Sequence, residues 1–167
     1  MLHVQDDRLT VRTKTLEAQL VRGALVSLTN LATGRAYLAP PTSGDPSPTP
    51  LQLIFRGHDT VDLTDRYWGR AACKLLSPIR AQFLIEVWDG LAVVTCSEDP
   101  DNGDLILEPS GMSHRAGLRS VRWRVGGIAP DLDLVAPFFQ GTRLKLSDPL
   151  LHNFRWAWPQ YWEAGLA

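Results

Sequence analysis

The chain has 167 residues, of which 44% are hydrophobic and 21% are charged, and its formal net charge is −1. This composition is typical of a globular domain, and the small net charge gives no electrostatic reason to expect nucleic acid or an anionic membrane as a partner. No apolar run approaches the roughly 20 residues that span a bilayer, and the N-terminus lacks the basic and apolar regions of a secretory signal. We therefore expect a cytoplasmic, reducing environment.

The first part of the chain alternates apolar and polar residues with a period of two, which predicts β-strands. Arg22-Gly23 is typical of a turn, and Gly34 in the loop Asn30–Gly34 can supply the positive φ that a tight return needs. The predicted strands are, in order, 9–13, 16–20, 25–28 and 35–38.

The stretch 39–50 contains five of the twelve prolines and predicts an exposed Pro-rich loop. A short buried strand is expected at 51–55, followed by an irregular polar stretch at 57–69. Longer strands are then expected at 71–76, 79–88, 91–96, 105–107, 118–125, 131–137 and 142–146.

The strand predicted at 79–88 has Phe83, Ile85 and Val87 on one face and Gln82, Leu84, Glu86 and Trp88 on the other, and it ends at the hairpin signal Asp89-Gly90. A second turn is expected at 101–104, and 110–117 is expected to be a loop. The two cysteines, Cys73 and Cys96, lie in apolar strand-like runs and are expected to be buried free thiols. A single bridge between neighbouring strands is the alternative.

No segment shows a sustained helical stripe, and the predicted strands number about ten to twelve. This pattern predicts an all-β, antiparallel β-sandwich that forms a single domain over residues 1–167. The chain ends in the apolar run Ala164–Ala167. We therefore expect the sandwich to be incomplete at its C-terminal end, and to self-associate through an exposed strand edge.

The sequence contains few signs of catalytic chemistry. The four histidines, His3, His58, His114 and His152, are scattered without metal-ligand spacing, and there is neither a phosphate-binding glycine loop nor a nucleophile elbow. The acidic run 98–104 fails as a calcium loop, because its sixth and twelfth positions, counted from Asp99, hold Asp104 and Ser110. We predict no cofactor and no metal.

The aromatic residues near the C-terminus are the best binding candidates. Trp156 and Trp158 would share one face of a strand, and flat aromatic surfaces stack on sugar rings; packing in the core or at a domain interface is the alternative. Glu163 either lines the same surface or pairs with an arginine such as Arg155 on the solvent face. The candidate substrate-binding residues are Trp156, Trp158, Tyr161, Trp162 and Glu163.

Two segments resemble one family of domains. Gly23–Leu38 resembles the early hairpin of galactose-mutarotase-like β-sandwich ("supersandwich") domains. Pro137–Leu144, followed by Trp158-Pro159 and Trp162-Glu163-Ala164, is similar to the later strands of such domains where they precede a (β/α)8 barrel in some glycoside hydrolases. The resemblance implies an N-terminal, non-catalytic domain that packs on a catalytic barrel, and it identifies no catalytic residue in this chain.

The leading hypothesis is therefore a non-catalytic sandwich of a glycoside-hydrolase-like protein, with carbohydrate and the C-terminal catalytic domain of the same protein as partners. A stand-alone carbohydrate-binding module is the alternative. A third hypothesis, a mutarotase or epimerase, needs a His/Glu acid–base pair. Only His114 and His152 could supply its base.

Overall fold

The computed structural model describes residues 1–38, 51–56, 60–62, 68–87, 90–123, 127–136 and 142–149. These ranges contain thirteen strands and no α-helix, which confirms the predicted all-β class. The chain divides into two compact units, residues 1–128 and 129–167, and each is described by itself.

The first sheet of residues 1–128 is built from the four earliest strands, joined as successive antiparallel hairpins. They are β1 (Leu2–Gln5), β2 (Arg8–Arg12), β3 (Leu16–Val21) and β4 (Ala24–Asn30). In β2 the period of two is plain, because Leu9 and Val11 are buried while Arg8 and Arg12 are exposed. The alternation therefore gives this sheet one apolar and one polar face.

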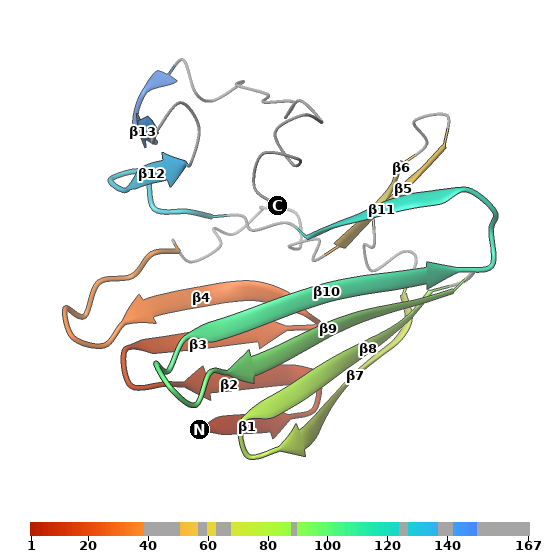
Figure 1. Ribbon diagram of the computed structural model, residues 1–167, viewed down its shortest axis with the longest axis horizontal. Helices are drawn as coiled ribbons and strands as arrows, with labels where there is room; N and C mark the ends of the chain where they lie inside the picture. Colours follow the sequence, from red (N-terminus) through yellow and green to blue (C-terminus); the bar gives the residue numbers. More distant parts are fainter. Residues whose placement is uncertain are drawn as a thin grey trace. The chain divides into compact units, whose positions relative to one another are not determined.

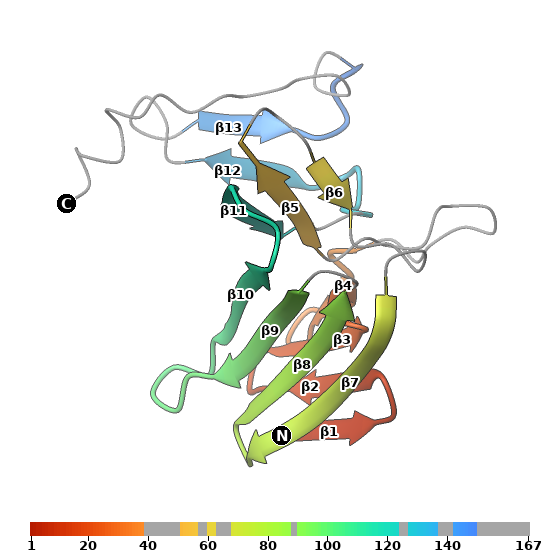
Figure 2. The same ribbon diagram turned by 90° about the vertical axis from the view of Figure 1, so that its right-hand side faces the viewer.

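The second sheet repeats the same arrangement with longer strands, in the order β10-β9-β8-β7. Its strands are β7 (Trp68–Ser77), β8 (Arg80–Val87), β9 (Gly90–Glu98) and β10 (Leu105–Ser113). Figures 1 and 2 show the two four-stranded sheets as separate layers of residues 1–128.

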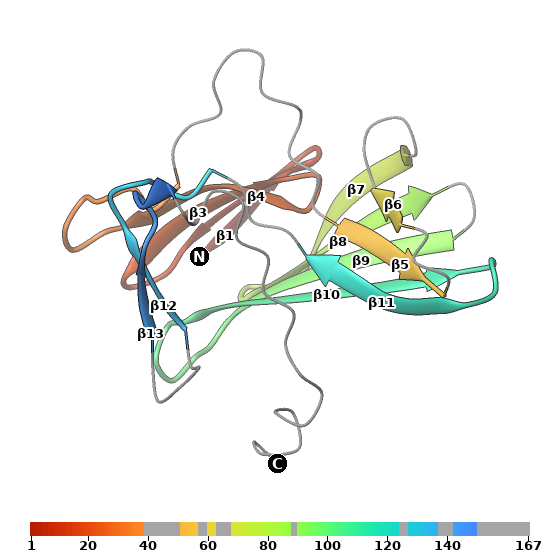
Figure 3. The same cartoon turned by 90° about the horizontal axis from the view of Figure 1, so that it is seen from above.

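A third sheet continues this unit. The chain turns back after β10 into β11 (Leu118–Trp123), which pairs with β5 (Leu51–Phe55), and β5 in turn pairs with β6 (Thr60–Asp62); Figure 3 shows β11 beside β5. The Arg115 guanidinium lies 4.5 Å from the centre of the Phe55 ring, a cation–π contact.

In residues 129–167, β12 (Asp133–Ala136) and β13 (Thr142–Lys145) form a hairpin with an Asp133–Arg143 ion pair.

One hydrophobic core joins the two four-stranded sheets, as expected for a sandwich. Leu9 and Leu20 from the first sheet and Phe83 and Ile85 from the second are completely buried. The remaining buried members of the cluster are Leu2, Val11, Ala18, Leu25, Leu38, Leu53, Phe55, Ala81, Ala92, Val94 and Cys96. The predicted separation of the two faces of the 79–88 strand is confirmed, because Phe83 and Ile85 are buried and Leu84 is exposed.

The turns of the first sheet use the residues that the sequence singles out. Arg22 and Gly23 have φ values of +51° and +82°, the pattern of a type I′ hairpin turn, and Gly34 has the predicted positive φ, +69°. Between them, the Asn30 carboxamide oxygen accepts hydrogen bonds from the amides of Ala32 and Thr33 at 2.9 and 3.1 Å. Both predicted turns are confirmed.

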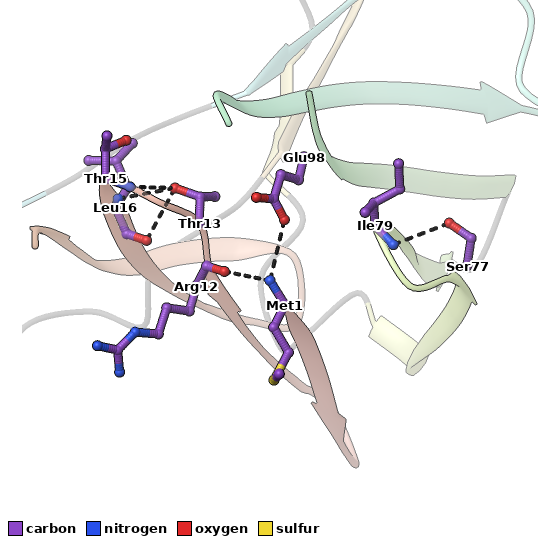
Figure 4. Close-up of polar contacts among 8 residues, drawn as sticks. All are labelled: Met1, Arg12, Thr13, Thr15, Leu16, Ser77, Ile79 and Glu98. Atoms are coloured by element: carbon purple, nitrogen blue, oxygen red, sulfur yellow. Dashed lines mark hydrogen bonds and ion pairs between the residues drawn. The ribbon is translucent and has the colours of Figure 1, made fainter. Parts of the chain in front are cut away.

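The connection between β2 and β3 is held by a threonine. The Thr13 hydroxyl accepts hydrogen bonds from the amides of Thr15 and Leu16 at 3.3 and 3.1 Å (Figure 4). In the same view the N-terminal ammonium of Met1 contacts Glu98 of the other sheet at 3.3 Å. At the end of β7, the Ser77 hydroxyl accepts a hydrogen bond from the Ile79 amide at 3.3 Å.

Several predicted element boundaries are wrong. No strand is predicted at β1. Residues 110–113 are predicted to be a loop, but they form the end of β10 and pair with β9. The strand predicted at 35–38 is reduced to two isolated bridges, at Ala36 and Leu38. The irregular stretch predicted at 57–69 contains β6 and the start of β7. The predicted loop at 39–50 lies outside the described residues.

Candidate functional site

All five candidate substrate-binding residues lie outside the described ranges. They are Trp156, Trp158, Tyr161, Trp162 and Glu163. Their grouping therefore stays a prediction.

The acidic run at 98–104 folds as a turn that binds its own backbone. The Asp99 carboxylate accepts a hydrogen bond from the Asp101 amide at 2.9 Å, and the Asn102 side chain accepts one from the Asp104 amide at 2.7 Å. Gly103 completes the turn with a φ of +78°. These Asx-type bonds explain the composition of the run without a ligand, and no three potential metal ligands cluster in the part of the chain that the structure describes.

The two cysteines are free, as predicted; Cys96 is buried as expected, whereas Cys73 is only half-buried. Burial raises the pKa of Cys73 to about 11; burial, and secondarily the charge of Cys73, raise the pKa of Cys96 to about 12. The two residues lie on β7 and β9, with β8 between them, so their Cα atoms are at least roughly 9.6 Å apart at a strand spacing of 4.8 Å. A disulfide needs less than about 7 Å, which excludes the alternative of an intramolecular bridge. High thiol pKa values also make both residues poor nucleophiles.

The outer face of the β1–β4 sheet is polar except for Val21, which is half-buried and lies opposite Arg8. The strand register places its outward side chains in rows across the sheet. These side chains are His3, Gln5, Arg8, Thr10, Arg12, Glu17, Gln19, Ser27 and Thr29. Arg12 and Glu17 pair at 3.6 Å. This is the ordinary solvated face of a half-buried antiparallel sheet.

The outer face of the β7–β10 sheet differs, because apolar side chains occupy many of its positions. Leu84 is 37% exposed, Ile106 41% and Met112 57%. We call this surface the β7–β10 face. Its outward side chains are Ala72, Lys74, Arg80, Gln82, Leu84, Glu86, Leu91, Val93, Thr95, Ser97, Ile106, Glu108, Ser110 and Met112.

Two neighbouring rows cross the middle of the β7–β10 face. One row is polar and runs Lys74–Gln82–Thr95–Glu108; the next runs Ala72–Leu84–Val93–Ser110. The Gln82 amide donates a hydrogen bond to the Thr95 hydroxyl at 3.2 Å, and Thr95 is only 7% exposed. Apolar and polar rows therefore lie next to each other on this exposed face.

The sequence pattern contains part of the signal for this face. Alternation places Gln82, Leu84 and Glu86 together, opposite the buried residues of the same strand. It does not tell which strands are neighbours, so the rows that combine Leu84 with Val93, or Lys74 with Glu108, become visible only with the register.

Comparisons with protein family models, with curated proteins and with solved structures gave no match to this chain. Within the described ranges, no helix has the length and apolarity to cross a membrane. What is established is therefore an architecture: an antiparallel all-β fold with a sandwich of two four-stranded sheets.

Proposed function

We propose that this chain is the N-terminal, non-catalytic β-sandwich domain of a glycoside-hydrolase-like, carbohydrate-active protein, in which it supports a catalytic barrel that the chain does not contain. The observation that carries the proposal is the structure of Gly23–Leu38, the longer of the two segments with the family resemblance. It forms β4, the Asn30 loop and a return that bridges Thr29 to Ala36, so the resembling residues form consecutive parts of one sandwich sheet.

The glycines of this segment have specific structural roles. Gly23 and Gly34 both have positive φ, which strongly favours glycine, and Leu38 at the end of the segment is buried in the core. These roles of Gly23, Gly34 and Leu38 in the hairpin and the core support the proposal. Of the second segment, Thr142–Leu144 lies in β13, and residues 137–141 lie outside the described ranges.

An activity assay tests the non-catalytic role. We expect the purified 167-residue protein to leave a panel of aryl glycosides unchanged, with a commercial glycosidase as the positive control. Robust turnover, retained through a second purification step, would contradict the proposal. The transcript downstream of codon 167 gives the complementary test, because the proposal requires a continuing frame with an alternating β/α pattern.

A stand-alone carbohydrate-binding module is the second candidate, favoured by Trp156 and Trp158, which would share a face of one strand. It predicts binding to a polysaccharide, weakened by roughly 1–3 kcal/mol in Trp156→Ala or Trp158→Ala. Gln19→Ala, on the polar face of the first sheet, is the matched control and should bind as the wild type does. Failure to bind any polysaccharide in a broad panel would count against this candidate.

A further inference from the structure

We propose that the protein forms a two-fold symmetric dimer in which the β7–β10 faces of two copies pack against each other. This inference is independent of the proposed function. It starts from the contrast between the two sheets of the sandwich: one outer face is polar except for the half-buried Val21, whereas the other leaves Leu84, Ile106 and Met112 between 37% and 57% exposed. Leu84 lies on the central strand β8, and Ile106 and Met112 lie on the edge strand β10. Exposed apolar side chains on a regular sheet favour burial against a second surface.

The order of the strands makes the β7–β10 face complementary to itself. A two-fold axis parallel to the strands, between β8 and β9, places β7 over the partner's β10 and β8 over the partner's β9. Residues of one row then face residues of the same row. Lys74 and Glu108 are the two ends of one row, so Lys74 lies over the partner's Glu108, and the same pair forms again on the other side of the axis.

The charges of this row, Lys74 and Glu108, have no ion-pair partner among the residues that the structure describes. A two-fold axis perpendicular to the strands through this row would instead place Lys74 over a second Lys74. Electrostatic complementarity therefore selects the parallel axis and sets the register of the two faces.

The apolar residues follow the same symmetry. Leu84 faces the partner's Val93 beside the axis, which gives the interface an apolar centre, and Gln82 faces the partner's Thr95. At one end, Ile106 faces the segment of the partner's β7 that contains the bulge at Leu76, a residue that is 46% exposed. At the other end, Glu86 faces the partner's Leu91 in the last outward row of the face.

The size of the face predicts the strength of the dimer. Four strands at about 4.8 Å and about eight residues at 3.4 Å give a footprint of roughly 500 Å² per copy, or roughly 1,000 Å² in total. That is the lower end of specific protein interfaces. We therefore expect a reversible equilibrium between monomer and dimer that depends on protein concentration.

Charge reversal in the full 167-residue chain, followed by sedimentation equilibrium, tests the geometry. Lys74→Glu and Glu108→Lys should each weaken the dimer by roughly tenfold or more, because each places like charges together twice. The double variant Lys74→Glu/Glu108→Lys should restore most of the affinity. Arg8→Glu, an exposed charge reversal on the other sheet, is the matched control and should leave the dimer unchanged.

A substitution at the centre of the β7–β10 face distinguishes the proposed face-to-face dimer from a dimer that pairs along a free strand edge. Leu84→Glu should abolish the dimer, whereas pairing through the β7 edge would leave it intact, since Leu84 lies on β8. Far-ultraviolet circular dichroism and urea titration identify any variant that fails to fold, and Leu84→Lys then serves as the replacement. A protein that is monomeric at all concentrations, a dimer insensitive to Leu84→Glu, or a double charge reversal that does not restore affinity would each overturn the proposal.

Discussion

Replacing Gly23 tests how closely the β3–β4 turn packs on the opposite sheet. A Cβ added at Gly23 would lie 3.2 Å from both Ile85 Cδ1 and Val94 Cγ2, which belong to completely buried side chains. Gly34 is the matched control, because its φ of +69° is also positive and an added Cβ would meet nothing within 4 Å. The two substitutions to alanine thus share the backbone strain and differ in the core contact.

The expected magnitudes follow from these two terms. The left-handed backbone conformation costs an alanine roughly 1–2 kcal/mol, and the gain from a less flexible unfolded chain, about 0.4–1 kcal/mol, offsets part of it at both positions. Overpacking of the core adds about 1–2 kcal/mol at Gly23 alone. We expect Gly34→Ala to lower the free energy of unfolding by about 1 kcal/mol, and Gly23→Ala by about 2–3 kcal/mol.

Urea denaturation of both variants measures the difference. Ile85→Val provides a second control, because it removes the Cδ1 atom that the new methyl group would meet. The double variant Gly23→Ala/Ile85→Val should therefore be destabilised by less than the sum of its single substitutions. Equal costs at Gly23 and Gly34, or strict additivity with Ile85→Val, would refute the packing argument.

Three further predictions concern the core, a thiol and a loop. Phe83→Ala should lower the free energy of unfolding by about 3–5 kcal/mol, whereas Leu84→Ala, its neighbour on the outer face, should change it by less than about 1 kcal/mol in dilute urea titrations. Burial raises the pKa of Cys96 from 9.0 to about 12, so the thiol ionises at a lower pH in the unfolded chain than in the folded one. The contribution of Cys96 to the free energy of unfolding is therefore fully present below pH 9 and is lost as the pH rises towards 12. Relative to Cys96→Ala, the wild type should lose about 2 kcal/mol of stability between pH 7 and pH 10.5, and a difference that is constant with pH would contradict this assignment. Asn30→Ala removes the acceptor for two loop amides and should lower the free energy of unfolding by about 1–2 kcal/mol. Tyr37→Phe removes only the 3.0 Å hydrogen bond that the Asn30 side-chain amide donates to the Tyr37 hydroxyl, and it should cost about half as much in the same urea titration.

Local patterns predict β2, β3, β4 and the two faces of β8 well, although not β1, because each depends on neighbouring residues only. The turn at Arg22-Gly23 needs positive φ, and Phe83 and Ile85 follow a period of two. The end of β10 was missed because Pro109 and Gly111 are poor strand formers. Pairing with β9 outweighs that preference: Gly90 lies so close to the Met112 carbonyl that an added Cβ would be 2.0 Å from its oxygen.

The candidate interaction surface was less accessible to sequence reasoning. The aromatic residues at 156–162 attract attention by composition alone, but they lie outside the described residues. The β7–β10 face has no such compositional signal. Lys74 and Glu108 are 34 positions apart in the sequence, and only the order of four strands places them in one row. That order follows from tertiary packing and not from the residues of any single strand.

The order of strands in the two main sheets also has a consequence for folding kinetics. In each sheet every strand pairs with its neighbour in the sequence, so both are meanders that can form from local hairpins. Hairpins form in about 1–10 µs, whereas contacts between distant parts of a chain require slower loop closure. We expect the two meanders to form early. The slow step should be the docking of Leu9 and Leu20 on Phe83 and Ile85, together with the pairing of β5 and β11.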